Sequence, residues 1–279
     1  MQIGCSLPAG TFMPEYTRTE KDISGLDNLL YGARVAQEIG YDYIEASMGA
    51  VLALSEDELT RLAGMVRAGS IRLRACNSFV PPSIPICTSS EQKLEQFVCT
   101  SMRALDALDV RTVIFGSGAA RRIPDTMAHE DGMECIRSFL ALCAREGEKY
   151  GVTTAIEPLN RTETNCVHTV RDGALLADSL STPAIRLLPD LFHMAMEQED
   201  PHVLMQYRDR IVHLHASEAP GRVFPGKYGG DYLRRCARTL HDAQWDGAVT
   251  VECVFGERFA DEAAQAYSFM KEVFLWDLK

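Results

Sequence analysis

The sequence predicts an α/β fold, a (β/α)8 TIM barrel that forms a single domain over residues 1–279. Short apolar or β-branched runs alternate with longer amphipathic stretches along the chain, which is typical of repeated strand–helix units around a parallel sheet. Eight such units in 279 residues, about one per 35 residues, fit a closed barrel better than an open doubly wound sheet. The open sheet is the alternative fold.

The expected strands are the eight apolar runs that turn and helix signals separate. They cover residues 2–7, 41–46, 71–77, 112–116, 153–157, 185–190, 211–216 and 249–254. A helix expected over residues 26–39 carries one apolar stripe, which would pack on the outside of the barrel. The residues that mark helix ends are Ser24 and Ser55 as N-caps, Glu58 as the capping-box partner of Ser55, and Gly40 and Gly151 just past helix C-termini.

Composition and charge exclude several classes of partner. The formal net charge of −11 repels phosphate backbones and anionic lipid surfaces, so we expect neither a nucleic-acid nor a membrane partner. No apolar run approaches the roughly 18 residues that span a bilayer, and the N-terminus has no signal-peptide pattern. Nine scattered cysteines without a C-x-x-C pair predict reduced thiols that fill the core. These features predict a cytoplasmic protein.

Four successive predicted strands end in side chains that could bind a metal. Strand five ends at Glu157, strand six at Asp190, strand seven at His215 and strand eight at Glu252. The C-terminal ends of barrel strands form the reactive face, so these side chains should converge there. Buried carboxylates that converge would repel one another unless a cation met them. Three carboxylates and one imidazole therefore predict one divalent metal ion, with Mn²⁺ favoured and Mg²⁺, Co²⁺ or Zn²⁺ as alternatives.

Each of these residues also has a purely structural interpretation. A single carboxylate at a strand end is more often a helix N-cap or an ion-pair partner, and it is the occurrence of four in register that favours the metal site. His213 has the same side-chain parity as His215 and would point into the barrel one layer deeper. We interpret His213 as a packing residue or as support for the ligand His215.

The second half of the chain resembles a known family. The motifs are E-P-L-N-R from Glu157, D-x-F-H-M from Asp190 and H-x-H-x-x-E from His213, each at a strand end, followed by Val251-Glu252. Together they look like the sugar isomerases and epimerases of the xylose-isomerase-like barrels, and in particular the ketose 3-epimerases of the tagatose and psicose type. The first half resembles this group only in architecture.

The resemblance implies specific roles for residues of this chain. Glu157, Asp190, His215 and Glu252 would bind the metal, and the two glutamates would also act as acid and base on opposite faces of the substrate. Glu163 and His193 would contact the substrate oxygens nearest the carbonyl. Related barrels commonly associate, so a homo-oligomer is also open, but no residue pattern identifies its interface.

One position departs from the family pattern. The substrate-binding arginine usually follows the metal histidine by six residues, where this chain has Gly221, and Arg222 comes next. We assign Arg222 to substrate binding on the assumption that the loop carries one inserted residue; a surface arginine is the alternative. In the first half, Glu45 and Asn77 lie at strand ends; a structural role is the favoured interpretation of each, and contact with substrate is the alternative.

The expected reaction is sugar isomerisation or epimerisation through a cis-enediolate. A metal that chelates a ketose would polarise the carbonyl, and one glutamate would remove a proton that the other returns from the opposite face. A dehydratase or lyase acting on a keto-sugar or inosose would use the same enediolate and is the main alternative. An endonuclease would need more metal ligands and a basic surface, and a barrel that only binds sugar would not need two acid/base glutamates.

Overall fold

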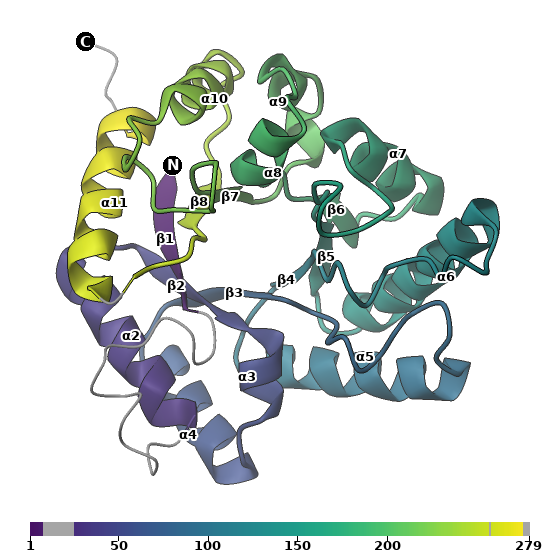
Figure 1. Cartoon of the computed structure of the whole chain (residues 1–279). Coiled ribbons are helices and arrows are strands. Elements are labelled where there is room, and N and C mark those ends of the chain that lie inside the picture. The colour runs from purple at the N-terminus through teal and green to yellow at the C-terminus, as the bar shows by residue number, and fades with distance from the viewer. Residues whose placement is uncertain (8–24, 257, 276–279) are drawn as a thin grey trace.

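The computed structural model describes residues 1–7, 25–256 and 258–275, and in it eight parallel strands curl into a barrel with helices outside (Figure 1). The strands are β1 (Gln2–Leu7), β2 (Tyr43–Ser47), β3 (Leu73–Asn77), β4 (Thr112–Phe115), β5 (Thr153–Ile156), β6 (Ile185–Leu187), β7 (Leu214–Ala216) and β8 (Ala248–Val251). The longer helices are α2 (Gly25–Ile39), α4 (Glu56–Arg67), α5 (Glu91–Ala107), α6 (His129–Glu148), α7 (Val170–Leu180), α10 (Asp231–Asp242) and α11 (Phe259–Phe274). The shorter helices are α3 (Met48–Leu52), α8 (Leu191–Met196), α9 (His202–Gln206) and the 3-10 turn Arg208–Arg210.

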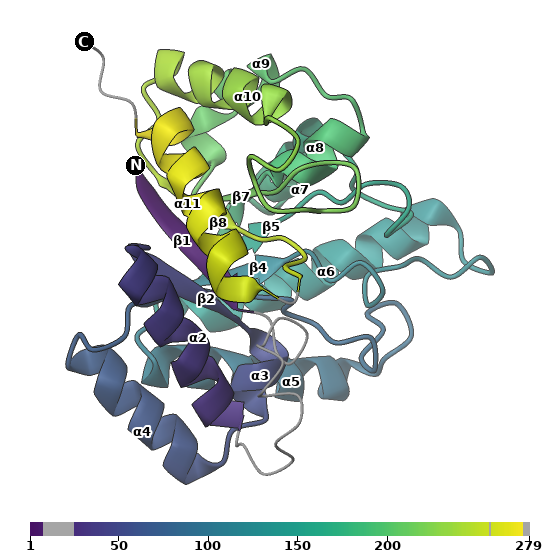
Figure 2. The ribbon, with the colours of Figure 1, turned by 60° about the vertical axis from the view of Figure 1, so that its left-hand side comes forward.

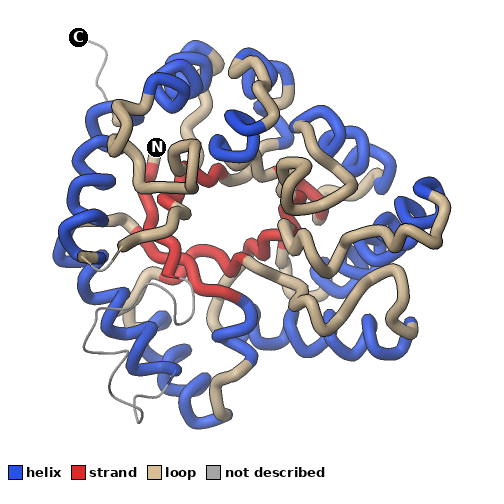
Figure 3. The backbone as a smooth tube through the Cα atoms, in the orientation of Figure 1, coloured by secondary structure: helices blue, strands red, loops and turns tan. Residues whose placement is uncertain are grey.

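The sheet closes on itself between its two end strands. Its strand order is β6-β5-β4-β3-β2-β1-β8-β7, and the tube view shows the resulting ring of strands inside the helices (Figure 3). Parallel bridges join Leu187 to Ile211 and Asp190 to His215 across the gap between β6 and β7. The Val212 N–H also donates to the Leu187 carbonyl at 3.1 Å. The predicted (β/α)8 barrel is therefore confirmed, and the open doubly wound sheet is not formed.

Every predicted strand except the first is longer than the observed one, and β6 and β7 are shortened most. The sequence suggested strands over residues 185–190 and 211–216, whereas β6 ends at Leu187 and β7 starts at Leu214. Pro189 has no N–H to offer a neighbouring strand, and Asp190 already caps α8 by accepting the Phe192 N–H. The regular ladder therefore stops before the ligand residue instead of including it.

Most of the predicted helix ends are present. The Ser55 side chain accepts the Glu58 N–H, and the Glu58 carboxylate accepts the Ser55 N–H at 2.9 Å, which completes the expected capping box. Gly40 and Gly151 follow α2 and α6 and have φ of +109° and +65°, values that favour glycine. The predicted N-cap Ser24 lies outside the described residues.

The buried residues form two layers around the strands. A small apolar group fills part of the barrel interior, and its members are Ala75, Ile114, Ala155 and Leu188. The larger core lies between the strands and the helices; α11, for example, packs on β1 and α2 (Figure 2). The rest of the interior, on the side of β1, β2, β7 and β8, is polar, and its buried side chains include Ser6, Glu45, Asn77, His213, His215 and Thr250. This polar half lies beneath the reactive face.

Two further sequence expectations concern the cysteines and the membrane. All nine cysteines are free thiols, and Cys166 is buried. No helix in the described part of the chain has the length and apolarity that crossing a bilayer requires.

Candidate metal centre and active site

The structure brings the four predicted ligand residues together at the C-terminal end of the barrel. One oxygen or nitrogen atom from each of Glu157, Asp190, His215 and Glu252 lies within 4.8 Å of the others. Each residue is held there by its backbone: Glu157 and Glu252 follow β5 and β8 and donate their N–H groups to the Phe115 and Ala216 carbonyls of the preceding strands at 3.1 and 3.2 Å. The barrel therefore fixes the four backbones independently of the side chains.

Charge and burial at this cluster favour a cation. Burial raises the pKa of Glu157 to about 7 and raises the pKa of Asp190, because ionised carboxylates lose their water. Burial also opposes ionisation of Glu252, but the neighbouring His215 and Arg222 more than offset it and lower its pKa well below the ordinary value. Burial would lower the pKa of His215, yet Glu252 and Glu45 raise it well above its ordinary value. Three carboxylates around one imidazole have the charge and the hard oxygen donors that a divalent ion requires.

The three predicted substrate-binding residues lie beside this cluster. Arg222 Nη2 donates to Asp190 Oδ2 at 2.7 Å and also to the Glu252 carboxylate. Arg222 Nη1 is 3.2 Å from His193 Nε2 and 3.7 Å from Glu163 Oε1. The departure from the family spacing therefore still brings the arginine into the site, where its guanidinium also lies 5.0 Å from the centre of the Phe192 ring.

His193 is held as a neutral imidazole. It is 1% exposed, and burial together with the nearby Arg222 lowers its pKa to about 3. The backbone N–H of Asn160 donates to Nδ1 at 3.3 Å, and the guanidinium of Arg222 lies at Nε2 on the other side of the ring. Asn160 also donates to Glu163 Oε1 at 3.3 Å, which ties the two predicted substrate residues to one amide. Sequence reasoning missed Asn160, although it lies inside the E-P-L-N-R motif.

Five of the site residues line a cavity of about 500 Å³: Glu157, Glu163, His193, Arg222 and Glu252. Its floor includes Glu157 and Glu252, and its wall includes Val80, Pro81 and Pro82 of the segment after β3. Proline rings restrict the backbone, so this segment forms a stiff wall.

Asn77 and Gly116 lie against the side chains of Glu252 and Glu157. Asn77 Nδ2 donates to Glu252 Oε1 at 3.1 Å and to Ser6 Oγ at 2.7 Å, so Asn77 has the structural role favoured for it and orients a candidate ligand. Gly116 lies so close to Glu157 that an added Cβ would be 2.1 Å from Oε2. Local sequence patterns do not indicate this contact, because the Gly-Ser-Gly turn after β4 looks like an ordinary loop.

Arg121 is a wholly buried cation below the site. It is 0% exposed, and its Nη1 donates to the Glu157 carbonyl at 2.9 Å and to the Phe115 carbonyl at 3.2 Å. It therefore ties the loop after β4 to the backbone of the candidate ligand Glu157. Sequence reasoning did not find it, since an arginine in a loop is normally solvent-exposed.

Glu45 and His213 lie one layer deeper than the ligand cluster. Glu45 is not among the residues that line the cavity, so the structural role favoured for it fits the structure better than contact with substrate. His213 points into the barrel beneath His215, as the side-chain parity predicts.

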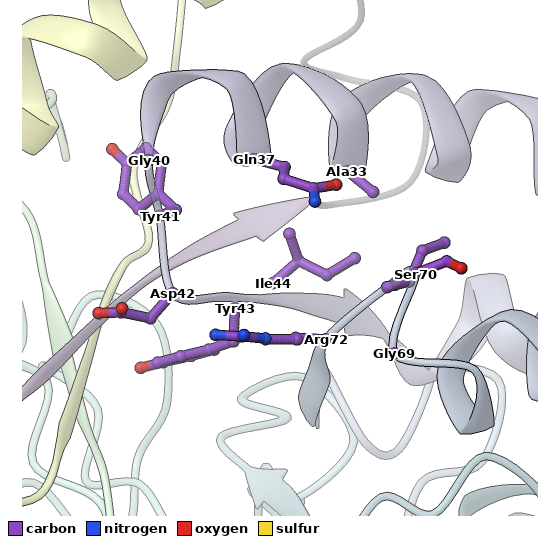
Figure 4. Close-up of a pocket in the computed structure, with 11 residues that line it drawn as sticks. Ala33, Gln37, Gly40, Tyr41, Asp42, Tyr43, Ile44, Gly69, Ser70 and Arg72 are labelled. Atoms are coloured by element: carbon purple, nitrogen blue, oxygen red, sulfur yellow. The ribbon is translucent and has the colours of Figure 1, made fainter.

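A second cavity lies at the opposite end of the barrel. It has a volume of about 310 Å³ and is lined by α2 and by residues 40–44 and 69–72, which precede or begin β2 and β3 (Figure 4). Ala33 and Gln37 of α2 lie over Ile44 in this view. The cavity shares no lining residue with the ligand cluster, and the N-terminal face of a barrel normally serves stability.

Comparison with known proteins identifies the family. Residues 33–273 match the sequence model of the xylose isomerase-like TIM barrels. The chain belongs to this family. Among the relatives of this xylose isomerase-like barrel, L-ribulose 3-epimerase from Methylomonas sp. (strain DH-1) is 25% identical over 227 residues, which are 80% of this chain and 77% of that protein. A probable ketose 3-epimerase from Synechocystis sp. is 34% identical over 101 residues, which are 35% of this chain and 34% of that protein.

Solved structures agree on the fold. D-allulose 3-epimerase from Methylomonas sp. superposes with a TM-score of 0.80 at 16% identity, covering 98% of this chain and 97% of that one. A 3-keto-D-glucoside 4-epimerase from E. coli superposes with a TM-score of 0.76 at 16% identity, covering 98% and 99%. At these identities the superpositions show a shared fold. The resemblance to the ketose 3-epimerase group, inferred above from the motifs, is confirmed.

Proposed function

We propose that this barrel is a divalent-metal-dependent sugar epimerase or isomerase that acts on a ketose through a cis-enediolate. The observation that carries the proposal is that Glu157 and Glu252 belong to one four-residue ligand cluster and also line one cavity with Glu163, His193 and Arg222. The names of the relatives, which are ketose 3-epimerases, support the same substrate class.

The proposed metal ligands are Glu157, Asp190, His215 and Glu252. One imidazole among three carboxylates favours Mn²⁺, with Mg²⁺, Co²⁺ or Zn²⁺ as alternatives. When bound, the ion would polarise the ketose carbonyl and stabilise negative charge on its oxygen.

The two glutamates would move the protons. Glu157 follows β5 and Glu252 follows β8, so their carboxylates reach the cavity from different sides of the barrel mouth. One carboxylate removes the proton from the carbon beside the carbonyl, and the other returns a proton to the opposite face, which inverts that carbon. The ring of His193 and the guanidinium of Arg222 both line the cavity and are placed to contact the neighbouring sugar oxygens.

The charge of the cavity supports an unphosphorylated sugar. Arg222 is the one Lys or Arg side chain among the described residues that line it, and its guanidinium is already engaged by Asp190 and Glu252. A phosphate would need further donors. We also propose a cytoplasmic location, which the nine free thiols support.

Deuterium exchange tests the proposal. The Mn²⁺-loaded protein is incubated in D₂O with a panel of ketoses, and the recovered sugars are analysed by proton NMR. We expect deuterium at C3 for epimerase chemistry, or at C1 with aldose formation for isomerase chemistry. Loss of water from the sugar would establish a dehydratase instead, and no exchange or product from any ketose would refute the proposal.

Isosteric variants locate the chemistry. Glu157→Gln and Glu252→Gln keep the size of each side chain and should each lower exchange by about 10²- to 10⁴-fold, the usual contribution of a general acid or base. The matched control is Glu146→Gln on α6, a buried glutamate that pairs with Lys149 away from the cavity. A barrel that only binds sugar would show no turnover in the wild type, and its sugar affinity alone would fall in Glu157→Gln and Glu252→Gln.

A further inference from the structure

Glu45 is a buried carboxylate that the proposed chemistry does not use. It lies on β2, is 0% exposed and shares the barrel interior with the ligand His215. Its carboxylate contacts His213 Nε2, accepts a hydrogen bond from the Thr250 hydroxyl, and lies 3.0 Å from His215 Nε2. These partners come from the β7 and β8 segments, so the carboxylate links three parts of the barrel wall. A buried carboxylate is costly unless donors compensate it, and here three donors do so.

The two ring nitrogens of His215 face different groups. Nδ1 is 3.1 Å from Glu157 Oε1 and 3.1 Å from Glu252 Oε2, inside the ligand cluster. Nε2 faces Glu45 in the layer below. A nitrogen that binds a metal must present its lone pair, and a neutral imidazole carries its single proton on the other nitrogen.

We propose that Glu45 is a positioning residue: it accepts the Nε2–H of His215 and thereby aims the Nδ1 lone pair at the metal. This inference rests on the proposed metal-dependent function. An ionised carboxylate only accepts hydrogen bonds, so its contact with His215 selects the tautomer with the proton on Nε2. Carboxylates that hold metal-binding histidines in this way fix the orientation of the ring and raise its basicity.

The neighbours of Glu45 hold it in this orientation. His213 and Thr250 both contact Oε1, which leaves Oε2 for His215. Thr250 Oγ1 also lies 2.9 Å from His213 Nε2 and 2.9 Å from the Tyr43 hydroxyl oxygen. The carboxylate therefore sits in a packed hydrogen-bond network that limits its rotation.

Glu45, His213 and His215 could in principle hold a second ion, since their ligand atoms lie within 4.8 Å of one another. The network argues against it. The separations are hydrogen-bond lengths, Thr250 already occupies one carboxylate oxygen, and an ion there would take the same His215 ring as the upper cluster. We therefore expect one ion per chain.

Calorimetric titration of the EDTA-stripped full chain with MnCl₂ tests the inference. Glu45→Gln keeps the shape but removes the charge, and Glu45→Ala removes the acceptor. We expect one Mn²⁺ per chain in the wild type and a dissociation constant about 10- to 100-fold higher in the variants, the usual effect of removing such a partner. Glu146→Gln is the control and should bind as the wild type does. If Glu45→Ala fails to fold, the isosteric Gln variant decides.

A spectroscopic readout separates positioning from a merely structural role. In the wild-type protein loaded with diamagnetic Zn²⁺, long-range ¹H–¹⁵N correlations of His215 should show a protonated Nε2 and an unprotonated Nδ1. The opposite tautomer, Mn²⁺ binding by Glu45→Gln within twofold of the wild type, or two ions per wild-type chain would each overturn the inference. A wild type that binds no Mn²⁺ overturns the metal site as well, whereas one that binds Mn²⁺ but acts on no ketose overturns only the proposed reaction.

Discussion

Gly116 leaves room for the carboxylate of Glu157, and replacing it by alanine should damage the site without touching a functional group. A Cβ at this position would lie 2.1 Å from Glu157 Oε2, and ordinary contact begins at 3.4 Å, so the carboxylate must retreat by about 1.3 Å. Metal–ligand distances tolerate only about 0.2 Å, so a retreat of this size removes Glu157 from the ligand set. It also misplaces the proposed acid or base.

The expected loss is large and measurable. A displacement of about 1 Å can cost about 100-fold in rate, so kcat/KM of Gly116→Ala should fall by about 100-fold, equivalent to about 3 kcal/mol of transition-state stabilisation. Overpacking of the buried site should also lower the free energy of unfolding by about 1–3 kcal/mol. The assays are initial rates on the ketose that shows exchange, Mn²⁺ titration by calorimetry, and urea denaturation.

Gly64→Ala provides the control. Gly64 lies on the exposed side of α4, and an added Cβ there meets no atom within 4 Å. Alanine is the better helix residue, so this variant should gain about 0.5–1 kcal/mol of stability and keep its metal affinity and activity. Wild-type activity and Mn²⁺ affinity in Gly116→Ala would refute the reasoning, because Glu157 would then not be confined where the structure places it.

Three further predictions concern stability. Burial raises the pKa of Glu199 from 4.5 to about 7, so the folded state loses stability as pH rises through that window. Glu199→Gln should therefore stabilise the protein by about 1–2 kcal/mol at pH 8 but by little at pH 4.5. Equal changes in the free energy of unfolding at the two pH values, measured by urea denaturation, would contradict this. Mn²⁺ at 100 times its dissociation constant should add about 2.7 kcal/mol to the free energy of unfolding and raise Tm by roughly 5 °C. EDTA should reverse this shift, and the Asp190→Asn variant should not show it. Ser55→Ala should cost about 1 kcal/mol in urea denaturation by removing the cap of α4, whereas an unchanged midpoint would show that the capping box contributes nothing.

The sequence was sufficient for the fold class and for the four candidate ligands. Parallel strands place their C-termini at one end of a barrel, so polar side chains that close successive strands must share that end whatever the details of packing. Glu157, Asp190, His215 and Glu252 could therefore be grouped from local patterns alone, and the structure does bring them together. Strand ends were predicted less well, because Pro189 and the cap formed by Asp190 stop β6 early.

The supporting residues could not be predicted, because their contacts join distant parts of the chain. Glu45 meets His213 across 168 positions, and Asn77 meets Glu252 across 175. Nothing near Arg121 in the sequence indicates that its guanidinium is wholly buried against the carbonyl of Glu157. Periodicity records which face of a strand or helix is buried, but not which side chains meet inside the barrel.

For this protein, the amino-acid sequence by itself determined the barrel, the end of it where the candidate ligands meet, and the chemical types of those candidate ligands. Only the tertiary structure decided how the candidate ligands are oriented: it brought Arg222 into the cluster, made Glu45 a partner of His215, and placed Gly116 against the Glu157 carboxylate. The physical reason is that strand order and alternation follow from local backbone geometry, whereas hydrogen-bond partners and close contacts depend on how strands separated along the chain are placed in the closed sheet.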